Sequence, residues 1–385
     1  MKKICFLTDS IFSFGGVQRV TAVIAKELAK DYDVTIVTLD KPSEKDTSYY
    51  GLEEADIRYR FFSYPATPKW KNYCCKAYSY LYRRVLPQTR LTSDWYSHSS
   101  FPSEKRNALA HELQVGGYDI IIGVHAPLAV RLAACRKRLA ATRLIGWIHN
   151  SYDALFGDKS LYIGPELRKH YEYQLEKLHV TVVLCQYDAS RYHFPTQVIY
   201  NPLTLIPGTP ADGTSRKFLA VGRFSRLHKG FDLLIEAFRL FAKENDEWTL
   251  DIVGEGVEEP LYHEMIARYG LQQRITIHHF TNHIQDYYSQ AQVYVLSSRW
   301  EGFGLVLVEA MAHGLPVISS DLPTSREIMG DYGLYYINGD VNGLAHQMLQ
   351  ATKMDWTAKS NEAFGIASRF NLDSILAQWK KVMAK

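Results

Sequence analysis

Two glutamates in the stretch RWEGFGLVLVEAMAHG are candidates for binding chemistry. Glu301 directly precedes Gly-Phe-Gly, and Glu309 lies eight residues later inside an apolar run. A carboxylate in apolar surroundings is costly unless it is paired or hydrogen-bonded, so both side chains need a partner. Glu309 can accept two hydrogen bonds from a vicinal diol such as a ribose. Spacing alone allows Glu309 equally to be a capped or salt-bridged helix acid.

The loop around Glu301 favours an anion. Gly302 and Gly304 remove side chains where an anion or a sugar must touch the backbone. We expect a helix to begin near Phe303 or Gly304 and to end at Gly314. The free amides and the dipole at the N-terminus of such a helix favour a diphosphate.

Two cations precede another expected helix, in the stretch VGRFSRLHKGFDLL. Arg223 and Lys229 follow a short apolar run, and the helix is expected to begin near Phe231, with Gly230 and Asp232 in its first turn. Arg offers a planar fork and Lys a point charge, and both suit a phosphate. Spacing alone also allows two solvated surface cations.

Weaker signals lie in the first half of the chain. Gly15-Gly16 precede a helix whose first turn is near Val17, where backbone amides can approach an anion, or where a loop simply needs glycine. Asp40 closes an apolar run, but without a G-x-G-x-x-G fingerprint an aspartate that begins a turn explains it. His149, in GWIHN, follows another run, where a histidine commonly caps a turn.

The strands and helices expected to position these residues alternate regularly along the chain. Continuous apolar strands between helical patterns, such as 20–30, predict parallel sheets covered on both faces and hence an α/β fold class. The expected strands are 3–8, 33–39, 57–62, 118–124, 143–149, 180–185, 217–224, 249–256, 275–280, 293–298, 315–321 and 332–337. Ligands of such sheets gather at the carboxyl ends of the strands.

The chain of 385 residues is too long for one ordinary core, so two domains are expected. A segment rich in Pro, Gly, Thr and Ser at 201–215 is typical of a linker. We therefore expect a first domain at 1–200 and a second at 201–365. An amphipathic helix at 371–383, within a final segment 366–385, is expected to pack back on the first domain.

The motifs in this order resemble the GT-B retaining glycosyltransferases of family 4. The resemblance rests on G-G after the first strand, G-R-x(5)-K-G, and E-G-F-G-x(4)-E, in which Glu301 and Glu309 match the E-x(7)-E signature. It covers nearly the whole chain and is strongest from Lys217 to Tyr336. It implies two Rossmann-like parallel-sheet domains facing across a cleft. The N-terminal domain would bind an acceptor and the C-terminal domain a nucleotide sugar.

The resemblance also implies roles for single residues. Arg223 and Lys229 are expected to hold the donor diphosphate, with a backbone amide of Gly16 from the opposite domain. Glu309 is expected to bind ribose hydroxyls and Glu301 hydroxyls of the donor sugar.

Further roles follow from the same match. Backbone amides at Phe303, Gly304 and Leu305 are expected to assist donor binding. His149 matches a family histidine on the acceptor side, and Phe280 and Thr281 lie where the family receives the base.

The implied function is transfer of a hexose, with retention, from a nucleotide sugar to a glycan or lipid-linked acceptor in cell-surface polysaccharide synthesis. The donor is expected to be UDP-linked. No cofactor and no metal are expected, because two cations and a helix terminus can stabilise the leaving diphosphate. The one D-x-D, Asp31-Tyr-Asp33, fits an ordinary turn. The alternatives are a nucleotide-sugar epimerase of the same fold and a non-catalytic sugar-nucleotide-binding protein.

The net charge of +3 hides a basic window, 57–93, that contains no acid. Its cations are Arg58, Arg60, Lys69, Lys71, Lys76, Arg83, Arg84 and Arg90. Tryptophan and tyrosine interleave with them, a pattern that anionic bilayers attract, although a solvated helix and loop fit equally. No nucleic-acid motif accompanies the charge, so nucleic acid is not an expected partner.

The location expected from the sequence is the cytoplasm, or the inner face of the cell membrane as a peripheral protein. Five cysteines without metal-ligand spacing indicate free thiols in a reducing compartment. The apolar run at the N-terminus is too short for a secretory signal, and no apolar run approaches the roughly 18 residues of a membrane span.

Overall fold

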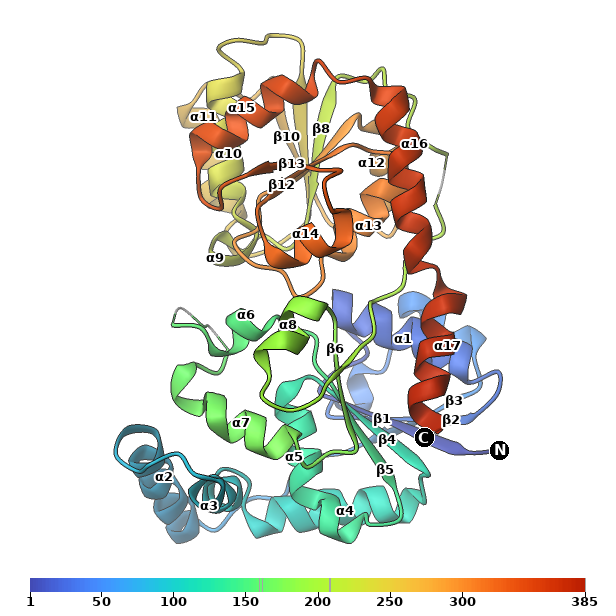
Figure 1. Cartoon of the computed structure of the whole chain (residues 1–385), viewed down its shortest axis with the longest axis vertical. Coiled ribbons are helices and arrows are strands. Elements are labelled where there is room, and N and C mark those ends of the chain that lie inside the picture. Colours follow the sequence, from blue (N-terminus) through green and yellow to red (C-terminus); the bar gives the residue numbers. More distant parts are fainter. Residues whose placement is uncertain (159, 161, 208, 385) are drawn as a thin grey trace. The chain divides into compact units, whose positions relative to one another are not determined.

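The computed structural model describes residues 1–158, 160, 162–207 and 209–384. The chain forms two compact units. Unit 1 consists of Met1–Tyr200 together with the residues from Ile375 onward, and unit 2 of Asn201–Ser374. Each unit is built on its own parallel sheet with helices around it (Figure 1).

The sheet of unit 1 has seven strands in the order β3-β2-β1-β4-β5-β6-β7, and every pairing is parallel. Its strands are β1 (Lys3–Thr8), β2 (Asp33–Thr38), β3 (Ile57–Phe61), β4 (Ile120–Val124), β5 (Arg143–Trp147), β6 (Val180–Val183) and β7 (Gln197–Val198). The order reverses between β1 and β4, and ligands of such sheets bind beside that reversal, at the carboxyl ends of the strands.

Helices of unit 1 cover this sheet. They are α1 (Gly16–Leu28), α2 (Lys69–Arg84), α3 (Arg90–Ser100), α4 (Ser103–Gly116), α5 (Ala126–Cys135), α6 (Tyr152–Phe156), α7 (Arg168–Leu175) and α8 (Gln186–Arg191). The last helix of the chain, α17 (Leu372–Ala384), joins unit 1 from Ile375 onward. There the ring of Trp379 packs against that of Trp147, with 4.7 Å between the centroids.

The sheet of unit 2 has six parallel strands in the order β10-β9-β8-β11-β12-β13. They are β8 (Lys217–Val221), β9 (Thr249–Val253), β10 (Ile275–His278), β11 (Val293–Leu296), β12 (Val317–Ser320) and β13 (Leu334–Tyr336). The helices are α9 (Arg226–Lys229), α10 (Phe231–Phe241), α11 (Glu259–Arg268), α12 (Ile284–Gln290), α13 (Leu305–Ala312), α14 (Pro323–Met329), α15 (Val341–Ala351) and α16 (Trp356–Ala367). The reversal here lies between β8 and β11.

The α/β architecture with two parallel sheets is confirmed, and each expected strand is present. Two short elements were not anticipated. The strand β7 has two residues, and α9 is a single turn between Arg223 and the helix expected near Phe231. β11 ends at Leu296, two residues before the expected strand end; the Ser297 hydroxyl donates to the carbonyl of Lys229 and the Ser298 hydroxyl to Glu301. Within the described ranges, no helix has the length and apolarity to cross a bilayer.

Candidate functional site

The centre of the candidate site in unit 2 is an ion pair between Lys229 and Glu301. Lys229 Nζ donates to Glu301 Oε1 at 2.6 Å, and Ser298 Oγ donates to the same oxygen at 2.6 Å. Burial acts to raise the pKa of Glu301, but the charge of Lys229 and these two hydrogen bonds outweigh it, so the pKa lies below its usual value. The buried carboxylate is therefore ionised at neutral pH.

A histidine that the sequence did not single out supports this ion pair. His228 stacks on Trp300, with centroids 5.0 Å apart and rings 5° from parallel. Burial, with the nearby charge of Lys229, lowers the pKa of His228 to about 4. His228 is thus neutral at pH 7 and adds bulk rather than charge. Its carbonyl accepts from the Arg299 amide at 2.7 Å, which ties α9 to the loop after β11.

The first turn of α10 is tied to the same loop. Arg299 donates to both carboxylate oxygens of Asp232, each at 3.1 Å, and Arg226 Nε donates to Asp232 at 3.1 Å. Gly230 adopts φ +66°, and a Cβ there would lie 2.3 Å from the carbonyl oxygen of Ser297. Glycine is needed at this position for both reasons. Asp232, expected only in the first helical turn, thus also fixes the loop that carries Glu301.

Arg223 differs from Lys229 in its surroundings. It is exposed just after β8, and within the described part of the chain its guanidinium forms no hydrogen bond or ion pair. The stem of Lys229 runs beside Gly222, where an added Cβ would lie 3.0 Å from its Cε. The two cations therefore meet at the end of β8, one neutralised by a carboxylate and one uncompensated.

The N-terminus of α13 supplies backbone donors on the other side of the β8–β11 reversal. Gly304 caps the helix with φ +83°, and α13 begins at Leu305, as the sequence indicated to within two residues. The side chain of Phe303 is buried and packs on Phe370, 5.6 Å between centroids. Any ligand contact of Phe303 would therefore come from its backbone amide.

Glu309 lies inside α13 and is 1% exposed. Its Oε2 accepts a hydrogen bond from the Tyr288 hydroxyl at 3.0 Å. The structure thus pairs this carboxylate with a phenol from α12. Tyr288 was not singled out, because no spacing rule links residue 288 to residue 309.

Phe280 and Thr281 follow β10, two strands from β8 in the same sheet. Phe280 is 41% exposed, and Thr281 Oγ1 accepts from the amide of His283 at 3.0 Å. The structure thus places both residues at the carboxyl edge that carries Arg223 and Lys229.

In unit 1 a tyrosine covers the Gly15-Gly16 loop at the start of α1. The amide of Gly15 donates to Tyr50 Oη at 2.9 Å, and the Tyr50 hydroxyl lies 3.3 Å from the carbonyls of Ser13 and Gly15. Asp40 Oδ2 accepts from the Ile11 amide at 2.9 Å. These contacts agree with a structural turn at Asp40.

Two histidines follow neighbouring strands of unit 1. His149, after β5, is buried, and its Nε2 has no hydrogen-bond partner among the residues that are described. His125, after β4, has its ring centroid 5.4 Å from that of His149. Burial lowers the pKa of His125 to about 4, and burial with His125 nearby holds the pKa of His149 well below its usual value. Both rings are therefore neutral at pH 7.

Sequence reasoning missed His125. Its backbone lies at φ +73°, ψ 153°, a region that residues other than glycine rarely adopt. Such strain persists where the surroundings fix it, and it clusters at functional sites. The signal was available, since GVHAP places His125 just after a buried strand in the way that GWIHN places His149.

Metal binding was not expected, and over the described ranges no group of three or more His, Cys, Asp or Glu could hold a metal ion. Asp31 of the D-x-D pairs with Lys380 at 2.6 Å, and Asp33 pairs with Arg58. Asp31 precedes β2 and Asp33 is its first residue, so both acids lie at the amino end of that strand.

Family comparisons agree with this arrangement. Residues 14–208 match Glycosyltransferase Family 4, and residues 204–369 match Glycosyl transferases group 1. The chain belongs to glycosyltransferase family 4 and is a glycosyltransferase, as its motifs indicated.

Individual relatives are glycosyltransferases as well. An uncharacterized glycosyltransferase of Haemophilus influenzae is 28% identical over 326 residues, which is 83% of this chain and 80% of that protein. The amylovoran biosynthesis glycosyltransferase AmsD of Erwinia amylovora is 30% identical over 171 residues, 43% of this chain and 48% of that protein. The chain thus spans about half the length of this second relative.

Among solved structures, Anabaena HepE in complex with UDP superposes with a TM-score of 0.75 at 21% identity, covering 100% of both chains. The lipopolysaccharide outer core galactosyltransferase WaaB superposes with a TM-score of 0.68 at 17% identity over 99% of both chains. These similarities identify the GT-B fold.

Proposed function

We propose that this glycosyltransferase moves a hexose from a UDP-linked sugar to a glycan or lipid-linked acceptor, with retention at the anomeric carbon, in cell-surface polysaccharide synthesis. The observation that carries the proposal is the set of charges at the carboxyl ends of β8 and β11. Arg223 is uncompensated, and Lys229 is held in place by a buried carboxylate. Relatives named for polysaccharide and lipopolysaccharide synthesis, and one bound to UDP, support the same substrate class.

The first step in this proposal is stabilisation of the leaving group. Departure of UDP leaves negative charge on phosphate oxygens, and charges fixed beforehand stabilise that state more than the ground state. Arg223 and Lys229 would take this charge, with amides at Phe303, Gly304 and Leu305 from the start of α13. The family resemblance would add a backbone amide of Gly16 to these donors. This arrangement would act without a metal.

Glu301 would bind hydroxyls of the donor sugar rather than act as a nucleophile. Its Oε1 already accepts from Lys229 and Ser298, and its pKa is lowered, both of which reduce its basicity. We therefore propose same-face attack. The bond between the anomeric carbon and the phosphate oxygen breaks as the acceptor oxygen bonds to that carbon. The acceptor proton passes to the departing phosphate.

The nucleoside would lie along the same edge of unit 2. Glu309 would accept from ribose hydroxyls through the carboxylate that Tyr288 orients. The exposed ring of Phe280, beside Thr281, would contact the base.

The acceptor side would be unit 1. His149 and His125 are neutral at pH 7, so each imidazole offers one donor and one acceptor to sugar hydroxyls. A neutral histidine pair suits an uncharged acceptor hydroxyl, whereas a charged imidazolium would attract the diphosphate instead. We also propose that the enzyme works in the cytoplasm at the inner face of the cell membrane, where lipid-linked acceptors lie.

The test is incubation with a panel of nucleotide sugars, first ranked by thermal shift, followed by NMR of the products with and without an acceptor glycan. We expect UDP release that depends on acceptor, and a product with the donor's anomeric configuration. Inversion would refute the proposed mechanism. Sugar nucleotide converted without acceptor would indicate epimerisation, and binding without turnover a non-catalytic protein.

A further inference from the structure

The hairpin of α2 and α3, residues 69–100, lies at one side of unit 1 (Figure 1). Trp70 is 71% exposed and Tyr73 is 73% exposed, and Tyr80 and Leu81 are exposed as well. Spacings of three, seven and one residue put these side chains on one face of α2. Large exposed side chains are normally scattered singly, so a stripe of them marks an interaction surface.

The stripe continues past the end of α2. Val85, Leu91 and Trp95 are also exposed, and Leu91 and Trp95 are four residues apart on α3. Seven large apolar side chains therefore reach solvent between residues 70 and 95. We call these seven the apolar stripe.

Cations of the basic window divide into two sets. Five are already engaged: Arg58 with Asp33, Arg60 with Glu112, Lys71 with Glu104, Arg83 with the Tyr96 hydroxyl, and Arg90 with Glu176. The other three, Lys69, Lys76 and Arg84, are exposed and have no acidic partner in the described part of the chain. Arg84 lies over the ring of Tyr80, 5.0 Å from its centroid. The uncompensated charge thus lies beside the apolar stripe.

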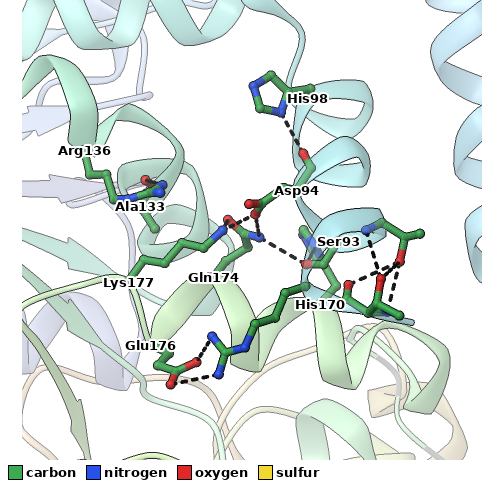
Figure 2. A network of polar contacts seen from close by, with 12 residues as sticks. Ser93, Asp94, His98, Ala133, Arg136, His170, Gln174, Glu176 and Lys177 are labelled. Carbon is green, nitrogen blue, oxygen red and sulfur yellow. Dashed lines mark hydrogen bonds and ion pairs between the residues drawn. The ribbon is translucent and has the colours of Figure 1, made fainter. Parts of the chain in front are cut away.

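The inner side of the hairpin is anchored to α7, as Figure 2 shows. Ser93 Oγ lies 3.0 Å from His170 Nδ1, and Gln174 Nε2 donates to Ser93 Oγ at 3.1 Å and to Asp94 at 2.9 Å. Tyr82 stacks on Tyr96, with 4.4 Å between centroids. Burial lowers the pKa of His170 to about 4, so this network is uncharged at the histidine near pH 7. The hairpin is held from behind, and its outer face takes no part in that packing.

We propose that the apolar stripe, with Lys69, Lys76 and Arg84, docks unit 1 on an anionic lipid bilayer. Charge complementarity selects this occupant: the window 57–93 has no acid, and tryptophan, tyrosine and cations together suit the headgroup region. The proposed surface is smaller than the window 57–93 expected from the sequence, because Arg58 and Arg60 lie in β3 and are paired with Asp33 and Glu112. It rests on the proposed location at the membrane but not on the proposed reaction.

The experiment measures binding of the full chain to vesicles of 70% phosphatidylcholine and 30% phosphatidylglycerol, by sedimentation at low salt. Each cation near such a surface contributes about fivefold to partitioning, so the triple variant K69E/K76E/R84E should bind at least roughly a hundredfold more weakly. A second variant, W70S/Y73S/L81S, should lose a similar factor while keeping its preference for anionic vesicles. The matched control K243E/K353E/K381E changes the net charge equally at exposed lysines outside the hairpin, and should bind almost as the wild type does.

Other results would overturn the proposal. Equal binding to pure phosphatidylcholine vesicles, or equal loss in the control, would remove the role of the three cations. Self-association in sedimentation velocity that the W70S/Y73S/L81S variant abolishes, without vesicle binding by the wild type, would assign the surface to a second copy of the chain. UDP release with a water-soluble acceptor is measured on each variant. Unchanged turnover with lost vesicle binding separates this inference from the proposed function.

Discussion

The two sheets carry different chemistry at the same place. After β4 and β5 in unit 1 come His125 and His149, which burial keeps neutral. After β8 and β11 in unit 2 come Arg223 and the ion pair of Lys229 with Glu301, whose carboxylate stays ionised although it is buried. Two similar α/β units therefore present a neutral histidine pair after two strands of one sheet and an ionic group after two strands of the other. A neutral pair suits hydroxyl groups, and a fixed cationic pair suits a diphosphate. The fold supplies the position, and the residue after each strand supplies the chemistry.

Among the charged residues of unit 2, substitution of Arg223 is expected to lower activity most. Arg223→Ala removes an uncompensated charge that would stabilise the leaving diphosphate, so we expect kcat/KM to fall about 1,000-fold, roughly 4 kcal/mol. Among the described residues the exposed side chain has no hydrogen-bond or ion-pair partner to lose, so the melting temperature should not change. Steady-state UDP release checks this, with Lys243→Ala as the matched control. Turnover within twofold of wild type would refute the role.

The neutral side is tested at His149. His149→Ala should lower kcat about 100-fold, because a hydroxyl-binding group is lost, while the affinity for UDP stays the same. Kinetics and calorimetric titration with UDP together check the prediction. Loss of UDP affinity in this variant would mean that His149 belongs with the phosphate contacts, and the contrast between the units would fail.

The neutral state of His125 also predicts how the stability of the protein depends on pH. The pKa of His125 is about 4 when folded, against about 6.5 unfolded. Between these two pKa values the unfolded chain binds more protons than the folded one. The contribution of His125 to the free energy of unfolding is therefore fully present above pH 6.5 and is lost as the pH falls toward 4. Between pH 8 and pH 5 the titration of this residue should lower the free energy of unfolding by about 2 kcal/mol.

His125→Gly removes this titration and relieves the positive φ. Urea unfolding should show the variant about 1 kcal/mol more stable at pH 8, with a smaller loss at pH 5, and activity should fall. A variant that loses stability at pH 8 would show that the backbone at residue 125 is not strained.

A smaller effect is expected at Glu309. Glu309→Gln keeps the shape and still accepts from Tyr288, but it binds a diol less strongly, so the KM for the donor should rise about tenfold with kcat nearly constant. Tyr288→Phe should raise it less. If kcat falls and KM does not, Glu309 acts in the transition state rather than in ground-state binding.

Much of the fold could be predicted because apolar strands and helices have distinct periods and the glycines mark helix ends. Gly304 and Gly314 bound α13 closely, and the break at residue 200 coincides with the boundary between the units. The partners of the candidate residues could not be predicted in this way. Tyr288 reaches Glu309 across 21 residues, and Lys229 reaches Glu301 across 72. Such contacts depend on sheet order, which no local pattern records.

The most direct test of the account is a crystal structure with UDP bound. We predict that its phosphates contact Arg223 and Lys229 at the end of β8 and the amides at the start of α13, with the ribose at Glu309. Phosphates that bind elsewhere and make no contact with Arg223 or Lys229 would contradict the central claim that these residues hold the leaving group.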